Sequence, residues 1–68
     1  MSYNRRKFLA ALVRGGAIFV REGGGHTILG GPNGRRTSIP RHTDVNRVTA
    51  RKIAKQLGLD WSEIEKGL

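Results

Sequence analysis

Residues 17–39 read AIFVREGGGHTILGGPNGRRTSI, and this stretch decides the fold because short strand-like segments alternate in it with glycine-rich turns. Residues 17–20 and 26–29 carry the β-branched, aromatic and aliphatic side chains that favour strands. The turn at residues 30–34 contains Asn-Gly, the strongest two-residue signal for a hairpin, and residues 35–39 follow it as a third strand closed by Pro40. Such short connections predict a three-stranded antiparallel meander.

Helices are predicted on both sides of the meander. The apolar side chains of residues 4–13 recur on one helical face, and a Gly-Gly pair follows them as a stop. The same periodicity holds in residues 49–57, which follow a linker at residues 44–48. Residues 60–63 have the Asp-x-x-Glu spacing of a capping box and predict a short third helix, whose Trp61 and Ile64 should dock on the body of the fold.

The predicted order is therefore α-β-β-β-α with a short extra C-terminal helix, in one domain covering residues 1–68. Strands followed by helices indicate an α+β fold, with the helices packed on one face of the three-stranded antiparallel sheet. The other face of the sheet would then be free for a ligand.

Charge is the strongest compositional signal. Thirteen Lys/Arg against five Asp/Glu give a net charge of +8, which predicts a polyanionic partner: nucleic acid first, an acidic protein second, a membrane surface third. Like charges at i, i+4 and i+8 on the second helix repel one another unless a partner neutralises them; they are Arg47, Arg51 and Lys55. Cations at residues 5–7 serve either a partner or solvent, since a helix N-terminus disfavours them.

Other classes of protein are disfavoured by what the chain lacks. It has no cysteine, and its two histidines and five scattered carboxylates make neither a metal site nor a metal-dependent nuclease. No cofactor motif is present. The longest apolar run, residues 8–13, is too short to span a bilayer. We therefore expect a soluble cytoplasmic protein without metal or cofactor.

His26 is the residue best suited to acid–base chemistry. Histidine titrates near neutral pH, and it could take a proton from a ribose 2′-hydroxyl or give one to a leaving 5′-oxygen. Gly24 and Gly25 before it would let a phosphate backbone come close and would offer unshielded N–H donors. On composition alone a single histidine at a strand start is more often structural, so both interpretations stay open at this point.

Further candidates for RNA contact lie around the third strand. Arginine forks match phosphate oxygens bidentately, and at least one of Arg35 and Arg36 is expected to face the ligand. The alternative is that one of them points to solvent, since neighbours on a strand face opposite ways. His42 is a second candidate as acid partner or RNA contact, and the alternative is a loop histidine bonded to the backbone. The residues predicted to contact RNA are Gly24, Gly25, Arg35, Arg36, Arg41, His42, Arg47, Arg51 and Lys55.

Two runs give the chain a family resemblance: FVREGGGH at residues 19–26 and PNGRRTSIPRH at residues 32–42. They resemble the HicA family of toxins, mRNA interferases of type II toxin–antitoxin pairs. The family pattern is Gly-Phe-Val, a basic or polar step, Gly-Ser-His, then Pro-Asp/Asn-Gly-Arg and a hydrophobic-Pro-x-His end. A later Thr opens a helix ending in Ala/Leu-Gly-Leu, as Thr49 and residues 57–59 do here. The similarity covers about residues 5 to 66.

This resemblance implies a double-stranded-RNA-binding-like fold, metal-independent cleavage of messenger RNA, and silencing by a cognate HicB-type antitoxin. It places the family's catalytic histidine on His26 and implies that the glycines clear space for the imidazole. The chain departs from the pattern at Gly25 and Thr27, where Ser and often a second His or aromatic stand, and at residues 30–31, where an aromatic-His pair is common. A non-catalytic RNA-binding module on the same fold and a protein-interaction domain with a basic face are the alternatives.

Overall fold

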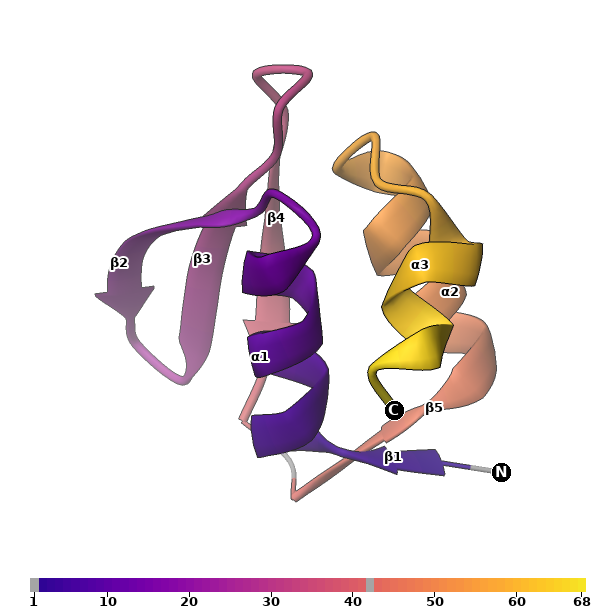
Figure 1. Cartoon of the computed structure of the whole chain (residues 1–68). Coiled ribbons are helices and arrows are strands. Elements are labelled where there is room, and N and C mark those ends of the chain that lie inside the picture. Colours follow the sequence, from indigo (N-terminus) through magenta and orange to yellow (C-terminus); the bar gives the residue numbers. More distant parts are fainter. Residues whose placement is uncertain (1, 42) are drawn as a thin grey trace.

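The computed structural model describes residues 2–41 and 43–68, and its elements follow one another as a helix, a sheet and two further helices (Figure 1). This order confirms the predicted α+β fold with its short C-terminal helix. His42, a predicted RNA contact, lies outside the described residues. The elements are β1 (Ser2–Asn4), α1 (Arg5–Arg14), β2 (Ile18–Gly23), β3 (His26–Gly30), β4 (Arg36–Pro40), β5 (Asp44–Asn46), α2 (Arg47–Gln56) and α3 (Trp61–Lys66).

The main sheet has the antiparallel order β2-β3-β4, which confirms the predicted meander. β2 runs three residues further than predicted, to Gly23, because the turn that ends it lies at Gly24-Gly25 and Gly23 still pairs with His26. The register shifts between Phe19 and Arg21, so that the residue between them forms a bulge. A bulge reverses the alternation of side chains beyond it, so it determines to which face of the sheet Arg21 points.

The connection between β3 and β4 covers residues 31–35, one residue further along the chain than the predicted turn at residues 30–34. The N–H of Gly31 donates to the carbonyl of Arg35 at 2.8 Å, and the N–H of Gly34 donates to the carbonyl of Gly31 at 3.0 Å. Asn33 does not take the positive φ that a type I′ turn requires, whereas Gly34 does, with φ +82°. The Asn33 side chain instead accepts from the Arg35 N–H and donates to the carbonyl of Gln56, and so ties the loop to the end of α2.

A small ribbon of β1 and β5 holds the starts of the two long helices together, and local sequence patterns do not predict it. Asn4 and Asn46 each end one of these strands and cap the helix that follows. Asn4 accepts a hydrogen bond from Lys7 N at 3.2 Å, and Asn46 accepts one from Val48 N at 2.8 Å. The predicted linker at residues 44–48 is therefore a strand plus the first turn of α2, and α2 begins two residues earlier than predicted.

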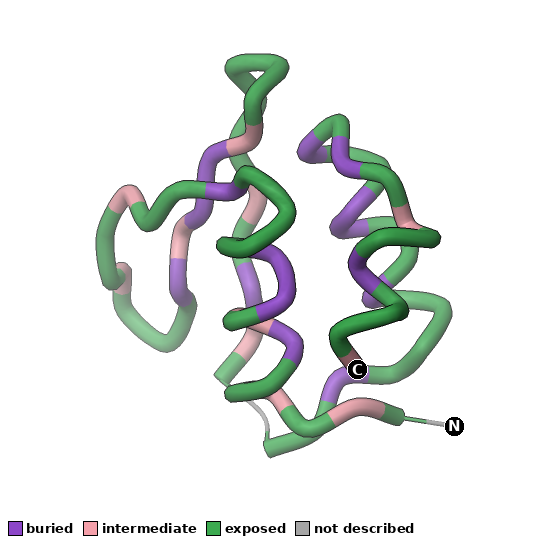
Figure 2. Tube along the Cα trace, in the orientation of Figure 1, coloured by how far each residue is buried: buried purple, intermediate pink, exposed green. Residues whose placement is uncertain are grey.

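The core lies between the helices and one face of the sheet. Figure 1 shows α1 in front of β4, with β3 to its left, and Figure 2 shows buried segments on the helices and on β3. Burying each large side chain contributes about 1.5–3 kcal/mol. As predicted, α3 docks on this core through Ile64, and Trp61 packs at its edge with its ring centroid 6.0 Å from that of Tyr3. The largest fully buried side chains are Phe8, Leu12, Leu29, Ile39, Leu57 and Ile64.

Candidate functional site

His26 is the first residue of β3, and its strand neighbours are Gly23 of β2 and Pro40 of β4. The next residue, Thr27, is 4% exposed and faces the helices, as Leu29 does. Because side chains alternate along a strand, His26 and Ile28 lie on the opposite side of the sheet, which we call the open face. The His26 side chain is exposed there, with a glycine on one side and a proline on the other. A large ligand can therefore reach the imidazole.

Two arginines share the open face with His26. Residues directly opposite each other on paired strands point to the same side, so Arg21, opposite Ile28, and Arg36, opposite Gly30, lie on the open face. Arg21 is level with the position two residues beyond His26 along β3, and Arg36 with the position four residues beyond it. Measured along the strand, these offsets are about 7 and 13 Å at roughly 3.3 Å per residue. The three residues thus lie on the same face of the sheet, one on each strand, at different levels along it.

Arg21 was not among the residues predicted from the sequence. Simple alternation along β2 does not place it, because the bulge after Phe19 changes the side to which the later residues point. The direct signal in the sequence is its position just before the glycines. Of the predicted pair Arg35 and Arg36, Arg36 lies on the open face at the start of β4, whereas Arg35 belongs to the preceding loop.

The turn before His26, formed by Gly24 and Gly25, has no side chains. Gly25 has φ +82°, a conformation that residues with a side chain rarely adopt, so its glycine is required by the backbone. A Cβ added to Gly24 would meet no atom of the described residues within 4 Å. Gly24 is therefore not needed for packing within the part of the chain that the structure describes. Its effect is to leave the surface beside the imidazole without side chains.

A hydrogen-bonded network lies behind His26, on the helix side of the sheet. Arg5 donates through Nε to the carbonyl of Pro40 at 2.9 Å and through Nη2 to Thr27 Oγ1 at 2.5 Å. Thr27 donates its hydroxyl to Glu22 Oε1 at 2.5 Å, and Arg41 forms an ion pair with the other oxygen of Glu22. These contacts join the start of α1 to the three strands around His26. Arg5 is thus used inside the fold and belongs neither to a solvated cluster nor to a partner surface.

The network keeps Glu22 ionised. The hydrogen bond from Thr27, together with the positive charge of Arg41, lowers the pKa of Glu22 below its ordinary value of 4.5, against a smaller opposing effect of partial burial. Near neutral pH the carboxylate therefore accepts from both partners. Its charge compensates Arg41, so the excess positive charge of the open face rests on Arg21 and Arg36.

The remaining predicted RNA contacts separate into two groups. Arg47 at the start of α2 donates to Glu65 of α3 at 3.1 Å, and Arg41 is paired with Glu22, so both form half-exposed ion pairs with carboxylates of the same chain. Arg51 and Lys55 are exposed on α2 and line a pocket beside α3. The structure does not bring these two cations together with His26 on the open face of the sheet.

Two further features follow from the described residues, 2–41 and 43–68. Among them no three His, Asp or Glu side chains come together in a group that could hold a metal ion. None of their helices is both long and apolar enough to cross a membrane.

A comparison with known protein families identifies the family of this chain. The family described as HicA toxin of bacterial toxin-antitoxin matches residues 5–59, which is most of the chain. This chain belongs to the HicA toxin family. It is therefore a toxin of a toxin–antitoxin system, and its fold is the double-stranded-RNA-binding-like fold that the resemblance implies. A comparison with curated proteins gives no match.

The HicA match begins with Arg5 and ends at Leu59. It contains α1, the sheet with His26, and α2, so the open face lies wholly within it. α3 and Trp61 lie beyond it. The pocket between α2 and α3 therefore joins a part of the chain that matches the HicA family to a part outside the match.

Proposed function

We propose that this HicA-family toxin cleaves messenger RNA without a metal ion, with His26 as the general acid or base. The observation that supports this most directly is the exposed imidazole on the open face, which also carries Arg21 and Arg36. Such an arrangement serves RNA cleavage because the reaction needs proton transfer and stabilisation of phosphate charge, and both can come from side chains.

The proposed step uses the RNA's own nucleophile. The ribose 2′-oxygen attacks the adjacent phosphorus, its proton passes to a base, and the bond to the 5′-oxygen breaks as that oxygen receives a proton. The products are a 2′,3′-cyclic phosphate and a free 5′-hydroxyl. His26 carries one of these two proton transfers, and arginine forks stabilise the extra negative charge on the phosphate oxygens. His42 remains the candidate for the second transfer.

The glycine turn fits this role. A phosphate backbone passing over Gly24 and Gly25 would meet no side chain and could approach the backbone N–H groups closely. The pairing of Gly23 with His26 keeps the imidazole next to this bare surface. The RNA path that we propose therefore runs from the glycine turn over His26 towards Arg21 and Arg36. Activity on messenger RNA would place the protein in the cytoplasm, where a HicB-type antitoxin would block it.

The test is cleavage of a defined RNA by the purified protein in excess EDTA. We expect cutting by the native chain, none by His26→Ala, and a 2′,3′-cyclic phosphate at the new end. The same oligonucleotide with one 2′-deoxy position should resist cutting at that position. Loss of cleavage in EDTA, or equal cleavage by His26→Ala, would refute the mechanism. Salt-sensitive binding without any products would instead indicate the RNA-binding module.

A further inference from the structure

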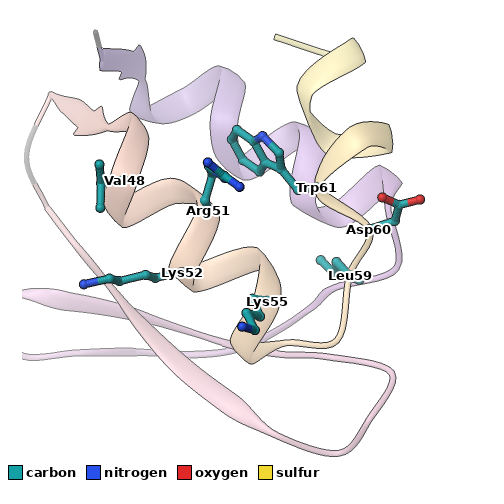
Figure 3. Close-up of a pocket in the computed structure, with 7 residues that line it drawn as sticks. All are labelled: Val48, Arg51, Lys52, Lys55, Leu59, Asp60 and Trp61. Carbon is teal, nitrogen blue, oxygen red and sulfur yellow. The ribbon is translucent and has the colours of Figure 1, made fainter.

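A pocket of about 490 Å³ opens between α2 and α3 (Figure 3). Its lining comes from α2, from the first residue of α3 and from the connection between them, whereas His26, Arg21 and Arg36 belong to the sheet. The lining residues are Val48, Arg51, Lys52, Lys55, Leu59, Asp60 and Trp61.

This pocket combines apolar walls with a cationic rim. Val48 is 62% exposed in the first turn of α2, and Leu59 and Trp61 form the opposite wall. Figure 3 shows Arg51 extended towards Trp61 and Lys52 pointing away from it, so the positive charges surround the opening instead of meeting at one point. The carboxylate of Asp60 accepts from Ser62 N at 3.0 Å as the cap of α3. A fitting ligand therefore has an apolar group with negative charges around it.

The stability of α2 does not account for these residues. The first turn of a helix favours Asp or Glu, yet the first turn of α2 has no acidic residue and exposes a valine. Arg51 and Lys55 are one helical turn apart, a spacing at which like charges repel. A ligand that covers the exposed apolar side chain with an apolar group and pairs the cations with negative charges would bind favourably on both counts.

A protein segment fits the pocket better than RNA does. Phosphate groups would use the cations but would gain nothing from Val48 and Leu59. A stacked base needs an open aromatic face, and Trp61 is half buried, with Tyr3 packed beside it. Tryptophan and arginine are also the residues that most often dominate binding between proteins.

We propose that this pocket binds an acidic, amphipathic segment of a partner protein. An apolar side chain of the segment lies between Val48 and Trp61, and its carboxylates pair with the cations of the rim. In this assignment Arg51 and Lys55 contact the protein partner, although the sequence alone favoured RNA for them. The site is separate from the open face, so binding here does not depend on cleavage by His26.

The experiment uses the fluorescence of Trp61, the single tryptophan of the chain. The full-length protein carries His26→Ala so that an RNA probe stays intact. It is titrated with a tryptophan-free peptide of glutamate and leucine, with a glutamate–serine peptide of equal charge, and with a polyuridine oligonucleotide. The pocket variants are Val48→Asp and Lys52→Glu, and Lys7→Glu on α1 is the matched control for charge. Val48→Asp should keep the fold, because the first turn of a helix favours an acidic side chain.

The glutamate–leucine peptide should shift the emission of Trp61 and bind about tenfold more tightly than the serine peptide. Each pocket variant should weaken this binding about tenfold, and Lys7→Glu should not. The proposal is overturned if neither peptide changes the emission, or if Val48→Asp binds as well as the parent. It is equally overturned if the polyuridine produces the shift and both pocket variants abolish it, since the pocket would then be an RNA site. None of these outcomes depends on RNA cleavage.

Discussion

Thr27 donates its hydroxyl hydrogen to Glu22 across the paired strands β2 and β3, directly behind the open face that carries His26. The same oxygen of Thr27 accepts from Arg5 of α1, so one buried hydroxyl joins the helix to the strands around the candidate catalytic residue. The family often has a histidine or an aromatic residue at this position. In this chain the position is instead part of the framework that holds β3 in place.

Thr27→Val should destabilise the protein by about 1–2 kcal/mol, because it keeps the shape of the side chain but leaves Arg5 and Glu22 without their common partner. Urea unfolding followed by circular dichroism measures the change. Thr37→Val is the control, since its hydroxyl bonds to Gln56 at the surface and its loss should cost much less. Equal losses for the two variants would show that burial of the network adds nothing.

Stability should fall in acid as Glu22 takes up a proton. The folded protein lowers the pKa of Glu22 below 4.5, so near this pH the unfolded chain binds more protons than the folded one. The contribution is therefore complete above about pH 5 and is lost as the pH drops through the folded pKa. Carboxyl titration by NMR measures this pKa, and Thr27→Val, which removes the largest cause, should raise it. An unchanged pKa in that variant would contradict the assignment.

Arg21→Ala should lower kcat/KM for RNA cleavage by about tenfold to hundredfold, because a charge-assisted hydrogen bond contributes about 1.5–3 kcal/mol. Arg36→Ala should also reduce it. Arg21→Lys should recover part of the loss, since lysine keeps the charge but not the bidentate geometry. Lys7→Ala removes a cation from α1 and serves as the control. Equal losses from Lys7→Ala and Arg21→Ala would mean that total charge matters and the open face does not.

Substitutions at the two glycines of the turn distinguish a requirement for backbone conformation from a requirement for close approach of RNA. Gly25→Ala should destabilise the fold by about 1–2 kcal/mol, because its φ of +82° is unfavourable for a residue with a Cβ. Gly24→Ala should leave the melting temperature nearly unchanged, since a Cβ there meets no described atom within 4 Å. If RNA approaches this surface closely, Gly24→Ala should still raise KM for cleavage. An unchanged KM would remove Gly24 from the proposed RNA path.

The sequence by itself determined the features that depend on neighbours along the chain. Short apolar segments between glycine turns specify the meander, and periodic apolar residues specify the helices on either side of it, because strand and helix periods are local properties. The resemblance around residues 19–42 singled out His26. The charge of +8 already indicated a polyanionic partner, since composition is independent of fold.

Only the tertiary structure determined to which side the charged residues point and which partners they contact. The bulge in β2 places Arg21 on the same side as His26, and no simple period predicts such an insertion. Arg5, Arg41 and Arg47 are occupied by partners far away in the sequence, so equal cations along the chain are unequal in space. The β1–β5 ribbon likewise joins residues 2–4 to residues 44–46. Contacts between residues so far apart in the sequence form only when the whole core packs, so local sequence patterns do not predict them.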